Sequence, residues 1–311
     1  MWNLFGMKFG TTLRIDKKMT IGAHVSKNGG YLKAQDRGKE IGAECIQIFV
    51  QSPRSWQPPV GIESEAIEFR SESMIKSKKM LPMYVHASYL INLASPQIGL
   101  YKRSIAALKD NLNISNIVNA AGLILHLGSY KDTTKKDGLK RLITGLNEVT
   151  ESVDADVPIL IENTAGQGST VGREFDEIAD ILSKLNKANR FGVCIDTQHL
   201  FASGYTFESF EAVDHLTSRL KSTIGIEKIK CFHFNDSLVE SGSLRDRHAN
   251  LGQGFIGKQS LALIAGTPSF RYLPLILEVP GLNRSGPGKS DVATGKRLLK
   301  KGINLWDLRL L

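Results

Sequence analysis

Cysteines, long apolar runs and acidic residues are all scarce in this chain, and each shortage excludes a class of protein. The only cysteines among the 311 residues are Cys45, Cys194 and Cys231, too few for a disulfide framework. We interpret them as small buried hydrophobic residues of a protein that stays in a reducing compartment, cytoplasmic or nuclear. No apolar run approaches the ~20 residues of a transmembrane helix, so we expect no membrane partner. The 31 acidic residues are outnumbered by 40 Lys and Arg, and the net charge of +9 favours a polyanionic partner such as nucleic acid.

The chain shows no internal repeat, low-complexity tract or linker that would divide it. Residues 1–18 lack the continuous apolar stretch of a secretory signal, so we expect a protein that is not secreted and a flexible N-terminal extension. We expect one catalytic domain over residues 19–303 and a short C-terminal tail over 304–311.

Strand and helix patterns alternate along the whole of that domain. Apolar, β-branched segments recur at 20–25, 45–50, 83–87, 123–128, 158–163, 191–197, 228–236 and 274–279. Helical patterns follow most of them, and the connections are long enough for parallel pairing. The sequence therefore predicts an α/β protein, a single (β/α)₈ TIM barrel, whose active site lies at the C-terminal ends of the strands.

Residues with nitrogen or oxygen ligand atoms occur where these strands end. The set comprises His86, His126, Glu162, Asp196, His199, His233 and Glu278, with Asp246 and His248 in the loop after the seventh strand. A single histidine at a strand end is more often a hydrogen-bonded rim residue than a ligand. Nine such groups at one mouth would be costly to bury without metal ions. Imidazole and carboxylate without thiolate suit Zn²⁺, Mn²⁺ or Fe²⁺, and about ten bonds from nine side chains are enough for three ions.

Some neighbouring residues are candidates for supporting roles. His24 ends the first strand and Asn163 follows Glu162, so both could orient ligands without binding metal. The segment GQGST at 166–170 is compatible with a phosphate cradle made by backbone amides, and equally with a tight turn that needs glycine.

Six motifs in order give the chain a resemblance to the endonuclease IV family of apurinic/apyrimidinic endonucleases. They are IGAHVSKNGG at 21–30, HASYLINL at 86–93, IENTAGQGS at 161–169, GVCIDTQH at 192–199, HFND at 233–236 and DRHANLGQGFIG at 246–257. The resemblance covers about Ile21 to Gly281. It departs from many members at Gln198, where Cys is frequent, and at Pro53, and neither position is a ligand.

The resemblance implies a metal-dependent DNA repair enzyme of base excision repair. Such an enzyme hydrolyses the phosphodiester 5′ to an abasic site in double-stranded DNA, leaves a 3′-hydroxyl, and would also clean damaged 3′ ends. It implies three Zn²⁺ ions per chain, with Mn²⁺ or Fe²⁺ replacing some of them. We expect the protein to act as a monomer.

The resemblance also distributes the ligands. His86, His126 and Glu162 would hold one ion; Glu162, Asp196, His233 and Glu278 a second; His199, Asp246 and His248 a third. Glu162, as the bridging ligand, and Glu278, as a proton acceptor, would be the catalytic side chains.

Three further residues match the family's probes of damaged DNA. Arg54 follows the second strand, and Tyr89 and Leu90 follow the third. They would enter the duplex where the abasic sugar has rotated out. The alternative for Tyr89 and Leu90 is ordinary loop packing.

Two other functions remain open at the level of sequence. Sugar isomerases and epimerases use the same type of barrel with one or two metal ions, and the extra pair Asp246 and His248 argues against them. A non-catalytic DNA-binding barrel is the second, and the complete set of ligands argues against it.

Overall fold

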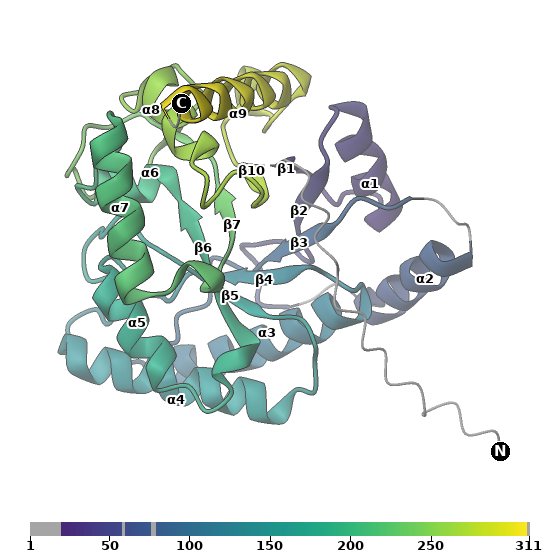
Figure 1. Cartoon of the computed structure of the whole chain (residues 1–311). Helices are drawn as coiled ribbons and strands as arrows, with labels where there is room; N and C mark the ends of the chain where they lie inside the picture. The colour runs from purple at the N-terminus through teal and green to yellow at the C-terminus, as the bar shows by residue number, and fades with distance from the viewer. Residues whose placement is uncertain (1–19, 58–59, 76–78, 310–311) are drawn as a thin grey trace.

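The computed structural model describes residues 20–57, 60–75 and 79–309. Parallel strands close into a barrel in the order β1-β10-β7-β6-β5-β4-β3-β2 (Figure 1). Their bounds are β1 Ile21–His24, β2 Cys45–Phe49, β3 Met83–His86, β4 Gly122–Leu125, β5 Ile159–Glu162, β6 Phe191–Asp196, β7 Ile229–His233 and β10 Leu275–Leu277. The predicted (β/α)₈ barrel is confirmed.

Helices connect the strands and cover the outside of the barrel. They are α1 Tyr31–Glu40, α2 Ile62–Ile75, α3 Ile98–Ile117, α4 Lys135–Ser152, α5 Phe175–Ser183, α6 Thr197–Ala202, α7 Phe210–Thr223, α8 Gly257–Gly266 and α9 Lys289–Arg309. Short 3-10 turns lie at η1 Ala188–Arg190, η2 Ile226–Lys228 and η3 Leu282–Arg284, and a hairpin of β8 Asp236–Ser237 and β9 His248–Ala249 follows β7. None of the helices in the described segments combines the length and apolar character of a membrane span.

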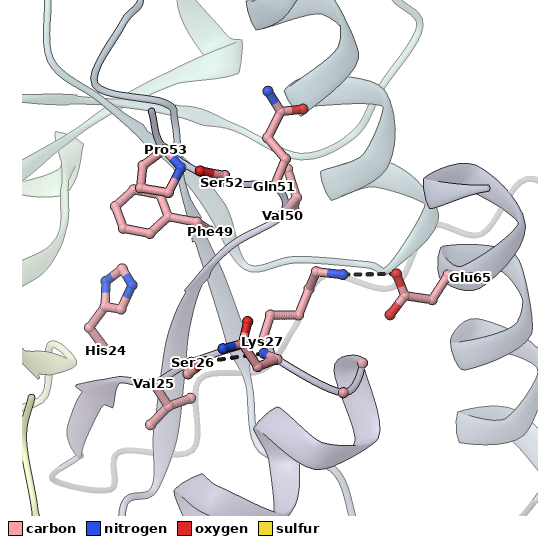
Figure 2. A pocket seen from close by; sticks show the side chains of 13 residues that line it. His24, Val25, Ser26, Lys27, Phe49, Val50, Gln51, Ser52, Pro53 and Glu65 are labelled. Carbon is pink, nitrogen blue, oxygen red and sulfur yellow. Dashed lines mark hydrogen bonds and ion pairs between the residues drawn. The ribbon is translucent and has the colours of Figure 1, made fainter. Parts of the chain in front are cut away.

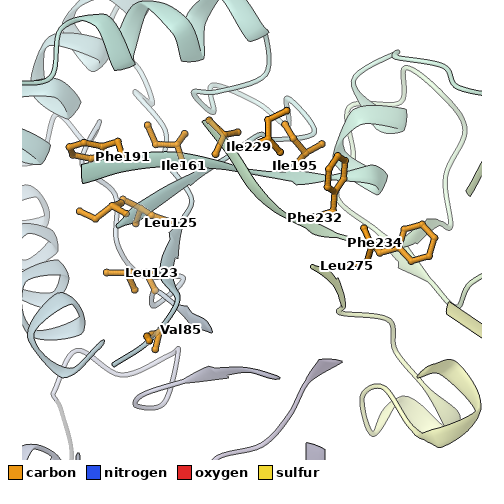
Figure 3. Close-up of a cluster of buried hydrophobic side chains, with 14 of the residues drawn as sticks. Val85, Leu123, Leu125, Ile161, Phe191, Ile195, Ile229, Phe232, Phe234 and Leu275 are labelled. Carbon is orange, nitrogen blue, oxygen red and sulfur yellow. The ribbon is translucent and has the colours of Figure 1, made fainter. Parts of the chain in front are cut away.

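Alternate residues of each strand face opposite sides, and this alternation builds two separate cores. The outward set, which includes Val85, Leu123, Ile161 and Phe232, packs against the helices (Figure 3). The inward set forms a smaller cluster inside the barrel. It contains Cys45, Tyr84, Ile124, Leu160, Cys194, Cys231 and Ile276.

Each barrel strand other than β1 gives one residue to this inner cluster. β1 places Gly22 there, where a Cβ atom would collide with the Sγ atom of Cys45. The three cysteines are buried free thiols, as expected.

Two residues further along every strand, the interior changes from apolar to polar. These positions are His24, Gln47, His86, His126, Glu162, Asp196, His233 and Glu278, one from each barrel strand or the residue just after it. We call them the inner polar ring. They face inward for the same reason as the apolar cluster beneath them, so the geometry of the barrel itself collects them at its C-terminal mouth.

The C-terminal boundary differs from the expected one. α9 continues to Arg309, so the tail expected over 304–311 is corrected: residues 304–309 belong to the barrel's helical layer. Trp306 is 4% exposed, and its indole N–H donates to the carbonyl of Leu263 in α8 at 2.8 Å.

The two helices lie side by side (Figure 1), and Gly302 approaches α8 so closely that a Cβ atom there would overlap the carbonyl of Ala262. Helix α8 has no counterpart among the segments predicted from sequence. The N-terminal extension expected over 1–18 lies outside the described residues.

Candidate metal centre

The structure brings the predicted ligands together in three overlapping groups at the mouth. Within each group, one ligand atom from every residue lies within 4.8 Å of the others. The groups are His86, His126 and Glu162; Glu162, Asp196, His233 and Glu278; and Asp196, His199 and His248. Glu162 and Asp196 each belong to two groups, so they occupy the positions where bridging ligands would be needed.

Asp246 is the one predicted ligand that belongs to none of the three groups. It was expected to share the third ion with His199 and His248, whereas Asp196 completes that group by distance. Its carboxylate oxygens nevertheless lie 3.3 Å from Nε2 of His199 and 3.4 Å from Nε2 of His248. The side chain is 49% exposed, at the solvent edge of the centre. The third group therefore has two carboxylates within reach of both imidazoles.

One nitrogen of each of four histidines is fixed by a protein acceptor. Nδ1 of His86 donates to the carbonyl of Ala87 at 2.8 Å, and Nδ1 of His199 donates to that of Asn163 at 2.9 Å. Nε2 of His233 donates to Oε1 of Gln47 at 2.8 Å, and Nδ1 of His248 reaches the carbonyl of Glu278 at 3.4 Å. This is the arrangement that holds metal-binding imidazoles in one tautomer and orientation.

The opposite nitrogens point into the centre. Nε2 of His199 and Nε2 of His248 are buried and make no well-aligned hydrogen bond among the described residues, although Asp246 oxygens lie 3.3 and 3.4 Å from them. Nε2 of His86 lies 3.3 Å from a Glu162 oxygen, and Nδ1 of His233 lies 2.9 Å from the other. Buried nitrogens without well-aligned hydrogen bonds, surrounded by carboxylates, fit divalent cations.

Burial and charge compete in setting the protonation of these groups. Burial alone would lower the pKa of His233, but Glu278 and Glu162 outweigh it and raise that pKa to about 10. His199 behaves in the same way: despite burial, Asp196 and Asp246 hold its pKa well above the usual value. Burial would raise the pKa of Glu162, yet His126 and His233 hold it well below its usual range. The mouth therefore combines the ionised carboxylate of Glu162 with the protonated imidazoles of His199 and His233.

Two residues outside the predicted ligand set support Asp196 and Glu278. Gln47, fully buried, donates from Nε2 to Oε1 of Glu278 at 2.6 Å while it accepts from His233. Asn235 donates to Oδ2 of Asp196 at 2.7 Å, and its own Oδ1 accepts the backbone amide of Glu278 at 2.9 Å. Sequence reasoning missed both. A lone glutamine inside the apolar segment CIQIFV was the available signal for Gln47.

The expected supporting residues lie next to the ligands. Nδ1 of His24 is 2.9 Å from the Gln47 amide nitrogen and 3.5 Å from Oε1 of Glu278. The side chain of Asn163 joins β5 to β6, because its Oδ1 accepts the backbone amide of Asp196 at 2.7 Å. Neither belongs to one of the three ligand groups.

Two hollows flank the centre. One, of about 570 Å³, lies beside His24 between the loops after β1 and β2, and its lining includes the ion pair of Lys27 and Glu65 (Figure 2). The other, of about 440 Å³, is lined by His126, His199, Asp246 and the 167–170 segment. Gly166 and Gly168 have φ of 86° and 63°, which agrees with a tight turn.

The candidate DNA probes lie at the rim of the mouth. Tyr89 is 57% exposed, and its ring meets Phe49 edge-on at 5.0 Å and His86 at 5.7 Å. Leu90 is half-buried and Arg54 is exposed. The hydroxyl of Ser88 donates to the carbonyl of Pro53 at 2.9 Å and so ties the two loops together.

Comparisons with known proteins agree with this geometry. A family model described as a xylose isomerase-like TIM barrel matches residues 36–302. A probable endonuclease 4 of Halothermothrix orenii is 37% identical over 262 residues, covering 84% of this chain and 94% of the relative. One of Chloroflexus aggregans is 37% identical over 261 residues, covering 83% and 90%.

Solved structures separate a near relative from fold neighbours. The crystal structure of endonuclease IV from Thermus thermophilus superposes with a TM-score of 0.76 at 29% identity, covering 92% of this chain and 99% of that one. A D-tagatose 3-epimerase-like protein superposes with a TM-score of 0.69 at 15% identity, covering 94% and 100%. At that identity the likeness shows the barrel fold alone.

Proposed function

This chain belongs to the endonuclease IV family, and on that premise we propose that it hydrolyses the phosphodiester 5′ to an abasic site in double-stranded DNA and leaves a 3′-hydroxyl. Cleaning of damaged 3′ ends would be a second activity of the same site in base excision repair. The observation that carries the proposal is the set of three ligand groups at one mouth, joined by Glu162 and Asp196.

We assign the three groups to three divalent ions, with Zn²⁺ as the main metal and Mn²⁺ or Fe²⁺ as replacements. The donors are imidazole and carboxylate, and two buried imidazole nitrogens make no well-aligned hydrogen bond in the described structure, as metal ligands require. His86, His126 and Glu162 would hold the first ion, and Glu162, Asp196, His233 and Glu278 the second. His199 and His248 would hold the third together with Asp246, and Asp196 lies within reach of the same ion. When bound, such ions act as Lewis acids that polarise a phosphodiester and make water acidic at neutral pH.

The side chains of the mouth would prepare the reaction. Glu162 lies in two of the groups, so its two carboxylate oxygens would serve as ligands to two ions that act on the phosphodiester. Glu278 is a proposed proton acceptor. Burial would raise its pKa, but His233 and His24 hold that pKa below the usual range, so the carboxylate is ionised at neutral pH.

Recognition of the damaged site is assigned to the rim. Tyr89 and Leu90 project from the loop after His86, and Arg54 from the loop tied to it through Ser88. An abasic site lacks the base that would stack there, so an inserted side chain meets little resistance. The ring of Tyr89 is 57% exposed at the rim beside His86, so it is available to contact a bound duplex.

The direct test is an incision assay on a duplex with a single abasic site. The metal-loaded protein should cut the damaged strand once, 5′ to the site, and should leave an intact duplex of the same sequence uncut. A pure, metal-loaded protein that binds the damaged duplex without cutting it would support the non-catalytic alternative. Turnover of a ketose with no incision would support the epimerase alternative, for which the comparisons supply only the fold.

A further inference from the structure

Two of the proposed ligands, Asp246 and His248, stand on a loop and not on a barrel strand. The loop leaves the hairpin strand β8, passes through Asp246, returns as β9 at His248 and runs through NLGQGFIG to the start of α8. Loops of this kind are mobile unless their backbone is held. The position of these two ligands therefore depends on what fixes the loop.

The buried carboxylate of Asp236 holds the far end of this loop. Its Oδ2 accepts the backbone amides of Gly252 and Gly254 at 2.8 and 3.1 Å. Its Oδ1 accepts those of Ile256 and Gly257 at 3.0 and 3.3 Å. Asp236 is 0% exposed, and its hydrogen-bond donors among the described residues are backbone amides. A buried carboxylate with several amide donors forms strong, charge-assisted hydrogen bonds, and here the N-terminus of α8 adds its own positive potential.

The near end of the loop is held by different contacts. Gln198 donates from Nε2 to the carbonyl of Arg245 at 3.0 Å, directly before Asp246. The amide of Leu238 donates to the carbonyl of Arg247 at 2.9 Å, and Ser237 pairs with His248 in the hairpin. Asp246 and His248 thus lie between two fixed segments of the loop. Contacts of Gln198, Leu238 and Ser237 hold the segment around the two ligands, and Asp236 holds the following segment through four backbone amides.

We propose that Asp236 is a positioning residue that sets the affinity of the third metal site, formed by His199, Asp246 and His248, without binding an ion itself. The proposal rests on the proposed metal-dependent function. It predicts a selective effect, because the ligands of the other two groups stand on or directly after barrel strands and do not depend on this loop.

The test uses two variants that disturb the same contact from opposite sides. Asp236→Asn removes the charge and turns one acceptor into a donor that faces backbone amides. Gly254→Ala leaves Asp236 intact but places a Cβ atom against the carbonyl of Ser237 and the Asp236 carboxylate. Glu177→Gln is the matched control: this buried carboxylate accepts the amide of Gly172 at 2.9 Å, in a loop without third-site ligands.

The first measurement is zinc content and affinity after dialysis against a weak chelator. The wild type and the Glu177→Gln control should retain three ions, and both test variants should retain two. The free zinc needed to fill the weakest site should rise about 10–100-fold in the test variants, the usual effect of losing a residue that orients a ligand. Variants that keep the third ion at wild-type affinity would overturn the proposal. Equal weakening of all three sites, with a lower melting temperature, would also overturn it and leave Asp236 a general structural residue.

The second measurement is amide hydrogen exchange of the metal-free proteins. Amides of residues 252–257 should exchange faster in both test variants than in the wild type, while strand amides stay protected. Unchanged exchange there would show that Asp236 does not hold the loop. This arm is independent of metal, so it separates the inference from the proposed function. If the wild-type chain bound no third ion, the proposed three-metal function would be contradicted. The role of Asp236 at the third site would then be contradicted as well, without any variant.

Discussion

At the mouth, hydrogen bonds to neighbouring residues fix the orientation of single side chains. Asn163 shows how: its side chain joins β5 to β6, and its backbone carbonyl accepts a hydrogen bond from Nδ1–H of His199. The other nitrogen of that ring then has to face the centre. Glu162 has no such supporting task, because its oxygens lie among His86, His126 and His233.

This difference predicts unequal effects of two neighbouring substitutions. Glu162→Gln keeps the size of the side chain but removes the charge shared by two ligand groups, so incision should fall by at least ~10³-fold, as when a main electrostatic stabiliser is lost. Asn163→Ala should cost about 10–100-fold, because it only loosens the orientation of ligands. Single-turnover incision rates at saturating zinc would measure both. Near-normal turnover of Glu162→Gln would show that this residue does not bridge.

The protonation of the histidines predicts how metal loading depends on pH. The pKa of His233 is raised to about 10 and that of His199 lies well above its usual value, so both rings are protonated at pH 7 in the metal-free protein. A metal ligand must be a neutral imidazole, so zinc loading at pH 7 should release the protons that these rings carry. Glu162 and Glu278, whose pKa values are lowered, should release none.

Calorimetry of zinc binding in buffers with different ionisation enthalpies would count the released protons. The count should fall, and the apparent affinity should rise, as the pH approaches 10. A binding enthalpy that does not depend on the buffer at pH 7 would contradict the protonated state of His199 and His233.

At the scale of elements, the sequence predicted the strands and their ligands for one physical reason. Each strand is an apolar segment, and its last inward-facing position lies at the mouth. A polar residue there, such as His86 or Glu162, interrupts the apolar pattern and can be recognised in the sequence of the strand alone. Gln47 is different, because its role depends on hydrogen bonds with His233 and Glu278, which are distant from it in sequence. Asp236 is likewise explained only by amides 16 to 21 residues away. Contacts of this kind have no local pattern.

The missed helix and the misplaced boundary share another cause. α8 and the end of α9 are stabilised by packing against each other. Gly302 permits the close approach, and Trp306 in α9 donates a hydrogen bond to α8. Neither segment shows this pairing by itself. The last residues of α9 therefore resemble a tail in sequence, although they complete the helical layer.

The loops after β2 and β3 predict where selectivity for damage resides. Tyr89→Ala combined with Leu90→Ala removes two rim side chains that belong to no ligand group. The variant should keep its zinc content and melting temperature, yet lose most of its preference for abasic over intact duplex in binding measurements. Tyr272→Ala, at a 40% exposed tyrosine beside the opposite end of β1, is the control and should keep that preference. An unchanged preference in the double variant would mean that these side chains only pack the loop.

At the scale of the whole molecule, charge and shape favour the same kind of ligand. The chain carries a net charge of +9, whereas its mouth is rich in buried carboxylates that metal ions would neutralise. A small sugar could use the mouth without the excess of basic residues elsewhere. A duplex needs both, because its phosphates extend well beyond the reacting bond.

Binding of duplex DNA should therefore depend steeply on salt. Each phosphate neutralised by Lys or Arg releases counterions, so the logarithm of the affinity should fall with the logarithm of salt concentration by about 0.9 per contact. Arg54→Ala, at the exposed rim, should reduce this slope by about one contact. Lys39→Ala removes an equal charge from the last turn of α1, at the face opposite the mouth, and should leave the slope unchanged. Titrations of the metal-loaded proteins with a fluorescent abasic duplex between 50 and 200 mM salt, roughly the range in which such contacts are resolved, would measure both slopes. A wild-type slope near zero would exclude the phosphate backbone as the ligand of this face, and equal losses in the two variants would show that total charge, and not the rim of the mouth, attracts the DNA.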